Sequence, residues 1–274
     1  KYQYLQGMER SFISRTVLGT VERTITLDYI IDSFSKTKVN KMKPLIRTLL
    51  RMSTYQLVYM EGVKDFAVCN EAVKLAMKRG FVSLKGFVNG VLRNVLRQGL
   101  PELPSKRIKK ISIKNSIPEW LVKHWVEHLG INATEKYAEK HLKRPVFWLR
   151  CDTRKIDPKS LAKNFGFSAE IYKERYLKVP DSQSLKILLE SKEFLEGLFS
   201  VQNPAAVDVI SLLKLKPSLK VWDACAAPGG KTAFMAELEP TLEILATDIS
   251  EKRLLSMQDL FSRLCLKNVK TACL

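Results

Sequence analysis

The sequence predicts a multi-domain protein: an all-helical domain, a small α+β middle domain, and then the start of an α/β domain with a parallel sheet. Three observations support this fold class. Apolar residues recur at helical spacing from residue 8 to 99, strand-like runs begin near residue 147, and strands alternate with helices from residue 219 onward. A chain of 274 residues is long enough to form two or three separate cores.

The first domain, residues 1–100, is expected to contain five short amphipathic helices. Pro44 suits the first turn of one of them, because a helix needs no N–H donor there. Gly80 is placed to end the following helix. In the last helix one face carries the apolar residues, which are Phe87, Val88, Val91, Leu92 and Val95.

A basic linker is predicted over residues 101–117, because this stretch is rich in proline and contains the run KRIKK. Residues 118–200 form the next predicted domain. It begins with two helical patterns and continues as FWLRCDT, DPKSLAKNFGF and AEIYKERYLKV. These three runs read as strand, helix and strand, which is typical of a small split βαβ unit of the RRM-like type.

The net charge of +18 is concentrated in the first two domains. Residues 201–274 hold nine Lys and Arg residues against eight Asp and Glu residues, so +17 lies in residues 1–200. A charge of this size and asymmetry favours a nucleic acid as the partner of the first two-thirds of the chain.

Residues 223–232, DACAAPGGKT, lie between a strand-like run and a helical pattern in the third domain, residues 201–274. A strand that enters Gly229 and Gly230 before a helix presents backbone N–H groups at a positive helix end, which suits a polar ligand. A nucleotide phosphate loop needs a glycine where Cys225 stands, and Pro228 would stiffen such a loop. A dinucleotide fold needs a third glycine that GGKTAF lacks, so we reject it.

S-adenosylmethionine is the third candidate ligand, and it needs only a tight turn and an acid for its ribose. Asp248 ends the next strand, 18 residues after Gly230, which is close to the expected spacing. Arg253 follows one helical turn later, and Lys231 is placed to meet the ligand carboxylate. Each has a structural alternative: Asp248 as an acid beside Ser250 at a helix start, and the two cations as solvated helix residues.

Two motifs resemble known families. DACAAPGGKT resembles the cofactor motif of RNA cytosine-C5 methyltransferases, and KGFVNGVLRNVLR resembles the end of a NusB-like RNA-binding domain. In this order they resemble the bacterial RsmB family, also called Sun or Fmu, from about Gly7 to the C-terminus. WLRCDTRK resembles a strand of the family's middle domain. VQNPAAV matches a segment in which the family carries an acid where Asn203 stands here.

The resemblance implies a Rossmann-like methyltransferase domain and S-adenosylmethionine-dependent methylation of cytosine C5 in 16S ribosomal RNA. We expect a cytoplasmic monomer without a metal or a membrane segment, because no apolar run approaches 18 residues and the N-terminus lacks a signal-peptide pattern. With Arg253 added from its spacing, the predicted cofactor contacts are Cys225, Ala226, Ala227, Pro228, Gly229, Gly230, Lys231, Asp248 and Arg253.

In this family a cysteine thiolate adds to C6 of the base, so that C5 becomes able to attack the methyl group. The two cysteines that the family uses lie in a Pro-Cys and a Thr-Cys-Ser motif, and neither motif occurs in this sequence, so no catalytic residue is predicted. The five cysteines present are expected to be small buried hydrophobic residues, namely Cys69, Cys151, Cys225, Cys265 and Cys273.

A parallel sheet with two complete strands and the start of a third cannot bury both of its faces. The sequence therefore looks like the front portion of a longer enzyme, and we expect this chain alone to be inactive. The alternative function is a non-catalytic RNA-binding or antitermination module, which the NusB-like helices alone would suggest.

Overall fold

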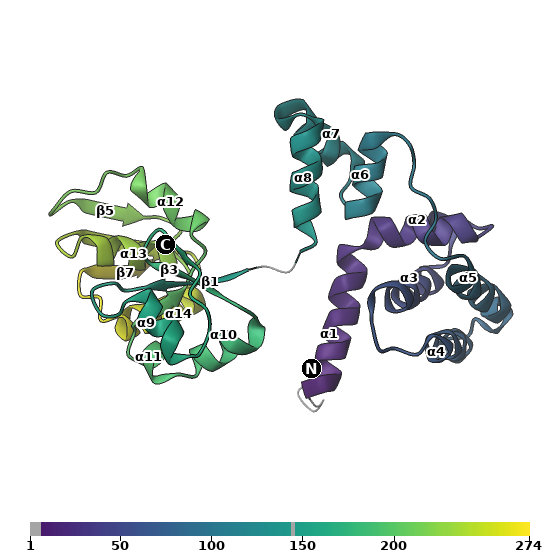
Figure 1. Ribbon diagram of the computed structural model, residues 1–274, viewed down its shortest axis with the longest axis horizontal. Coiled ribbons are helices and arrows are strands. Elements are labelled where there is room, and N and C mark those ends of the chain that lie inside the picture. Colours follow the sequence, from purple (N-terminus) through teal and green to yellow (C-terminus); the bar gives the residue numbers. More distant parts are fainter. Residues whose placement is uncertain (1–6, 144–145) are drawn as a thin grey trace. The chain divides into compact units, whose positions relative to one another are not determined.

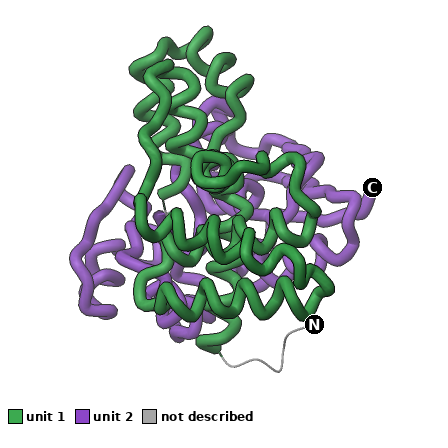
Figure 2. The backbone as a smooth tube through the Cα atoms, turned by 90° about the vertical axis from the view of Figure 1, so that its right-hand side faces the viewer, with its two compact units in different colours: residues 1–143 green, residues 144–274 purple. Residues whose placement is uncertain are grey.

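The computed structural model describes residues 7–143 and 146–274. Residues 1–6 and 144–145 lie outside this description, and with them most of the N-terminal segment searched for a signal peptide. The chain forms two compact units, residues 1–143 and 144–274 (Figure 2). In the described part of the chain, no helix is both long and apolar enough to cross a membrane.

The first unit is entirely helical, as predicted. It begins with five helices, and residues of the second to the fifth form a core in which Leu50, Val88 and Leu92 are fully buried. These helices are α1 (Gly7–Glu22), α2 (Thr24–Phe34), α3 (Pro44–Tyr59), α4 (Asp65–Lys78) and α5 (Lys85–Gln98) (Figure 1). Pro44 occupies the first turn of α3, and the short 3₁₀ turns Val39–Lys41 and Val82–Leu84 precede α3 and α5.

The helix α1 contacts the rest of its unit through small residues. Gly19 lies against the Tyr55 ring so closely that a Cβ atom there would be 2.0 Å from it, and Thr16 and Thr20 are also buried. Its apolar residues remain exposed instead, with Met8 at 84% and Val21 at 68% exposure. The helical spacing of these apolar residues therefore identified a helix but not its buried face.

The predicted linker is wrong over part of its length, because residues within it form a packed helix. The helices α6 (Arg107–Asn115), α7 (Glu119–Leu129) and α8 (Ile131–His141) share a second core that includes the buried Ile111. The hydroxyl of Thr26 in α2 donates to the Ile113 carbonyl at 2.5 Å, which ties α6 to the first five helices. Ile108 and Ile111 are three residues apart on one side of the helix, so they can pack in this core while the lysines point outward.

The second unit begins with a four-stranded antiparallel sheet in the order β2-β3-β1-β4. Its strands are β1 (Phe147–Cys151), β2 (Ile171–Tyr172), β3 (Tyr176–Val179) and β4 (Phe199–Val201), and its helices are α9 (Pro158–Asn164), α10 (Ser182–Leu189) and α11 (Lys192–Leu195). The run AEIYKERYLKV, predicted as one strand, is a hairpin. It turns at Lys173 and Glu174, which both have positive φ angles.

A three-stranded parallel sheet completes this unit, in the order β5-β6-β7. It consists of β5 (Lys220–Asp223), β6 (Glu243–Asp248) and β7 (Val269–Cys273), with the helices α12 (Ala205–Ser211), α13 (Gly230–Leu238) and α14 (Glu251–Arg263). The buried side chains of β6, such as Ile244 and Ala246, pack toward these helices. Side chains on the other face of the sheet are exposed, with Trp222 of β5 at 63% and Leu245 of β6 at 42%. One face of the sheet is therefore open in this chain, as the strand count predicted.

Candidate cofactor site

The glycine turn connects β5 to α13 at the carboxyl end of the parallel sheet. Asp223 ends β5, and its Oδ2 accepts a hydrogen bond of 2.6 Å from the Thr232 hydroxyl in the first turn of α13. This bond joins the two sides of the turn. Gly229 has a φ of +95°, in the left-handed region that glycine adopts without strain.

Close packing also requires glycine at the turn. A Cβ atom on Gly229 would lie 2.6 Å from Cγ of Met257 and 3.1 Å from the Phe261 ring, both in α14. A Cβ atom on Gly230 would meet Nε2 of Gln202 at 3.1 Å. The turn is therefore held between α14 and the segment that follows β4, so its backbone has a fixed position for a ligand.

Asp248 ends β6 and lies directly beside the turn. It is only 6% exposed, and its Oδ2 accepts a hydrogen bond from the Ala227 amide at 3.3 Å. Its Oδ1 accepts one from the Ser250 amide at 3.0 Å, which is the structural role considered for this acid. A carboxylate oxygen can accept more than one hydrogen bond, so both oxygens keep capacity for a ligand hydroxyl.

A hollow opens next to Asp248. Its lining consists of Ala227 and Pro228 from the turn together with Ser250, Lys252, Arg253 and Ser256 from the start of α14. Arg253 is 4.0 Å from Oδ1 of Asp248, and its side chain is 68% exposed. The exposed guanidinium is therefore free to move toward a ligand in the hollow.

The remaining predicted contacts differ in their surroundings. Ala226 is buried in the core between the sheet and α14, so only its backbone can reach a ligand. Lys231 is exposed and does not line the hollow. Cys225 is exposed at the start of the turn. Of the predicted contacts, Ala227, Pro228 and Arg253 line the hollow. Asp248 is bonded to the Ala227 amide but is not part of the lining, and Lys231 also lies outside it.

The expectation that all cysteines are buried is wrong for three of them. Cys69 and Cys151 are buried, whereas Cys225, Cys265 and Cys273 are exposed. Cys265 is not on a helix but just beyond the end of α14, with a φ of +60°. Burial raises the pKa of the Cys151 thiol to about 12 and also raises the pKa of Cys69. Both buried thiols therefore stay protonated at neutral pH and are poor nucleophiles.

A buried ionic network supports the turn from behind, and sequence reasoning missed it. Arg150 in β1 is 1% exposed; it forms an ion pair with Glu237 of α13 and donates to Oε1 of Gln202 at 2.6 Å. Burial lowers the pKa of Arg150 to about 10, which leaves it charged at neutral pH. Because Gln202 also contacts Gly230, the network links the antiparallel sheet to the start of α13. Gln202 and Glu237 are 52 and 87 residues away from Arg150 in the sequence, so local spacing could not reveal the network.

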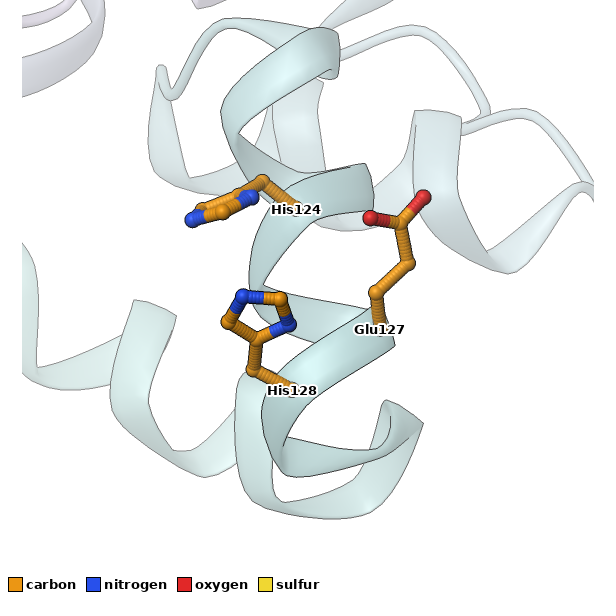
Figure 3. A group of neighbouring side chains, drawn as sticks. All are labelled: His124, Glu127 and His128. Carbon is orange, nitrogen blue, oxygen red and sulfur yellow. The ribbon is translucent and has the colours of Figure 1, made fainter.

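One group of side chains offers ligand atoms of the kinds that bind metals, although the sequence predicted no metal. His124, Glu127 and His128 lie on α7, with their ligand atoms within 4.8 Å of one another (Figure 3). The two imidazole rings are 4.4 Å apart. All three residues are exposed and belong to one helix, whereas structural zinc sites take four ligands. The group is in the helical unit, and the hollow beside Asp248 is in the other unit.

Two parts of the chain match known families. Residues 1–97 match the NusB family, and residues 210–274 match the family described as 16S rRNA methyltransferase RsmB/F. The chain is similar to the RsmB/F family. A probable ribosomal RNA small subunit methyltransferase B of Bacillus subtilis (strain 168) is 35% identical over 241 residues, and one of Synechocystis sp. is 30% identical over 243 residues. These matches cover 87% and 85% of this chain but 54% of each relative, so the chain spans about half the length of these RsmB proteins.

Solved structures agree with the fold of this chain. One crystal structure covers 98% of the chain and 62% of its own length, with a TM-score of 0.68 and 21% identity, which supports the fold alone. A methyltransferase homologue from Pyrococcus horikoshii is 27% identical, with a TM-score of 0.53, over 62% of this chain and 56% of its own. The similarity to the family therefore rests on the sequence matches. The likeness in the arrangement of helices and strands rests on the solved structures.

Proposed function

We propose that this chain carries the RNA-binding and cofactor-binding parts of a cytoplasmic, monomeric methyltransferase. The enzyme would use S-adenosylmethionine to methylate cytosine C5 in 16S ribosomal RNA. The observation that carries the proposal is the position of Asp248, a buried acid at the carboxyl end of the second parallel strand, in contact with the turn after the first. Ligands of open α/β sheets bind at this edge. The names of the RsmB relatives support ribosomal RNA as the substrate class.

The residues around the hollow fit S-adenosylmethionine. Asp248 can accept hydrogen bonds from the ribose hydroxyls, and Arg253, 4.0 Å from Asp248, lines the hollow. The first N–H groups of α13, at Gly230 and Lys231, have no acceptor within the helix and lie at its positive end. That end suits the carboxylate of the methionine part. Pro228 adds an apolar wall.

S-adenosylmethionine, when bound, supplies a methyl group on a positively charged sulfur. Methylation at C5 then requires a thiolate that adds to C6 of the cytosine and leaves after the C5 proton is removed. None of the three exposed thiols, Cys225, Cys265 and Cys273, is hydrogen-bonded to a base within residues 7–143 and 146–274. The contribution of this chain is therefore to bind and orient the two substrates, and we expect no methyl transfer by these 274 residues alone.

A labelled-methyl transfer assay on a 16S ribosomal RNA transcript tests the proposal. The assay compares this chain with a version extended to the length of its RsmB relatives. Transfer by the extended protein alone, with 5-methylcytosine as the labelled nucleoside, is the expected result. A label on another base would contradict the cytosine-C5 assignment, and transfer by the short chain would point to Cys225 or Cys273 as an unrecognised nucleophile.

A further inference from the structure

The helix α5 carries polar or cationic side chains at every fourth position, at Lys85, Asn89, Arg93 and Arg97. Residues four apart lie on the same side of a helix, so the four form a row. Two adjoining hollows run between this row and α4, and both include Asn70 and Arg93 in their lining. The row is thus one wall of a continuous groove on the helical unit, whose lining also includes the apolar residues Phe66, Val73 and Leu96.

The cations of the row have no acidic partners. In the described part of the chain, no carboxylate oxygen lies within 4.0 Å of the side-chain nitrogens of Lys85, Arg93 or Arg97. Arg93 donates to the Asn89 amide oxygen at 3.3 Å, and Arg97 to that of Asn94 at 2.9 Å. These bonds orient the guanidinium groups without neutralising them.

Few acids lie near the row. Asp65 contributes to one hollow, and Glu71 is paired with Lys74 at 2.8 Å on the α4 side. The groove therefore keeps a net positive charge that an anionic partner can compensate.

Two glycines lie beside the row, one helical turn apart. Gly86 and Gly90 are exposed within α5, and a Cβ atom on either would meet no atom within 4 Å. Neither has a positive φ angle, so the local backbone does not require glycine. Glycine inside a helix destabilises it relative to alanine. The two positions therefore expose bare backbone at a cost in stability, as expected where another molecule approaches closely.

We propose that this surface binds the sugar–phosphate backbone of RNA. We call it the α5 face and define it as Lys85, Gly86, Asn89, Gly90, Arg93 and Arg97. The three cations contact phosphates, the Asn89 amide contacts phosphate or sugar, and the RNA strand runs over the two glycines. The inference rests on the proposed function only in taking RNA, rather than an acidic protein, as the polyanion.

The first test measures the affinity of the whole chain for a 16S ribosomal RNA transcript as the salt concentration rises. The double variant Arg93→Gln/Arg97→Gln is expected to bind about tenfold more weakly at low salt, and the slope of log affinity against log salt should fall by about 2. The matched control is Lys36→Gln/Lys41→Gln, which removes the same charge from the exposed loop between α2 and α3. We expect this control to change the affinity less than about twofold.

The second test separates binding from stability. Gly90→Gln adds a good helix former where no atom is in the way, so the melting temperature should rise by about 2–4 °C. The same variant should weaken RNA binding, because its side chain covers the bare backbone. A variant that is more stable and binds RNA as well as the parent chain would overturn the role given to the glycines.

Other outcomes would overturn the proposal as a whole. Equal losses in the Arg93/Arg97 variant and the Lys36/Lys41 control would mean that binding depends on total charge. Unchanged RNA affinity in the Arg93/Arg97 variant would mean that the α5 face does not bind RNA, and an acidic protein would then be the partner to test. Calorimetry with S-adenosylmethionine on the same variants keeps this proposal distinct from the proposed function, because the α5 face variants should not change cofactor affinity.

Discussion

Gly229 in one unit of the chain, and Gly86 and Gly90 in the other, are present for opposite reasons. At the turn between β5 and α13, the fold leaves no room for a side chain at Gly229, and its φ angle favours glycine. In α5, nothing in the fold requires Gly86 or Gly90, since a Cβ atom at either would meet open space. The comparison separates glycines that shape a site from glycines that leave a surface open to a partner. It predicts opposite effects of substitution on stability.

The largest effect is expected behind the turn, at the buried Arg150. Arg150→Ala removes a 1% exposed guanidinium and leaves Glu237 buried without its partner, which should cost about 3–5 kcal/mol of stability. Urea denaturation followed by circular dichroism measures the loss. The matched control Arg150→Met/Glu237→Leu removes both charges and should recover most of it. If Arg150→Ala were as stable as the parent chain, the network would not support the turn.

At the turn itself, Gly229→Ala should destabilise the chain by about 2–4 kcal/mol. The substitution adds the strain of a left-handed non-glycine residue to a clash with Met257. The same denaturation experiment applies. A change of less than about 0.5 kcal/mol would mean that the turn relaxes easily, and the contrast with α5 would then disappear.

In α5 a glycine substitution is expected to have the opposite effect on stability. Gly86→Ala should stabilise the chain by about 1 kcal/mol, since alanine is the better helix former and its Cβ meets no atom within 4 Å. A thermal melt of the parent chain and the variant measures the difference. Destabilisation would reveal a structural need for this glycine and would weaken the case for an open RNA-binding surface.

The smallest effect concerns thiol reactivity rather than stability. With a thiol reagent at pH 8, Cys225, Cys265 and Cys273 should react quickly, whereas Cys69 and Cys151 should react only on unfolding. The slow reaction of Cys151 follows from its burial, which raises the pKa of its thiol to about 12 and so keeps it protonated at this pH. Fast labelling of Cys151 in the native chain would contradict the packing of the antiparallel sheet around it.

Local patterns in the sequence predicted the features that depend on nearby residues. The alternation of strands and helices around DACAAPGGKT indicated the parallel sheet, and the position of Asp248 after its strand indicated an acid beside the turn. The burst of charge in KRIKK obscured the helix α6, whose isoleucines are buried by helices on both sides in sequence. Arg150, Gln202 and Glu237 meet only in the folded chain, so spacing could not assign them a role.

The exposure of the cysteines was equally beyond local reasoning. A cysteine has the same hydrophobic character in a core strand as at a strand end, and only the packing around it decides its burial. Cys151 faces the core of the antiparallel sheet, whereas Cys225 follows the end of β5 at the edge where we propose that the cofactor binds.

Calorimetric titration of S-adenosylmethionine into the parent chain and the Asp248→Ala variant tests the central claim most directly, with the α5 variant Gly86→Ala as the control. The parent chain should bind, and Asp248→Ala should bind more weakly by about 1.5–3 kcal/mol, the typical value of hydrogen bonds to a charged group. Gly86→Ala should bind like the parent. Equal affinity in the parent chain and Asp248→Ala, or binding of ATP in place of S-adenosylmethionine, would contradict the account.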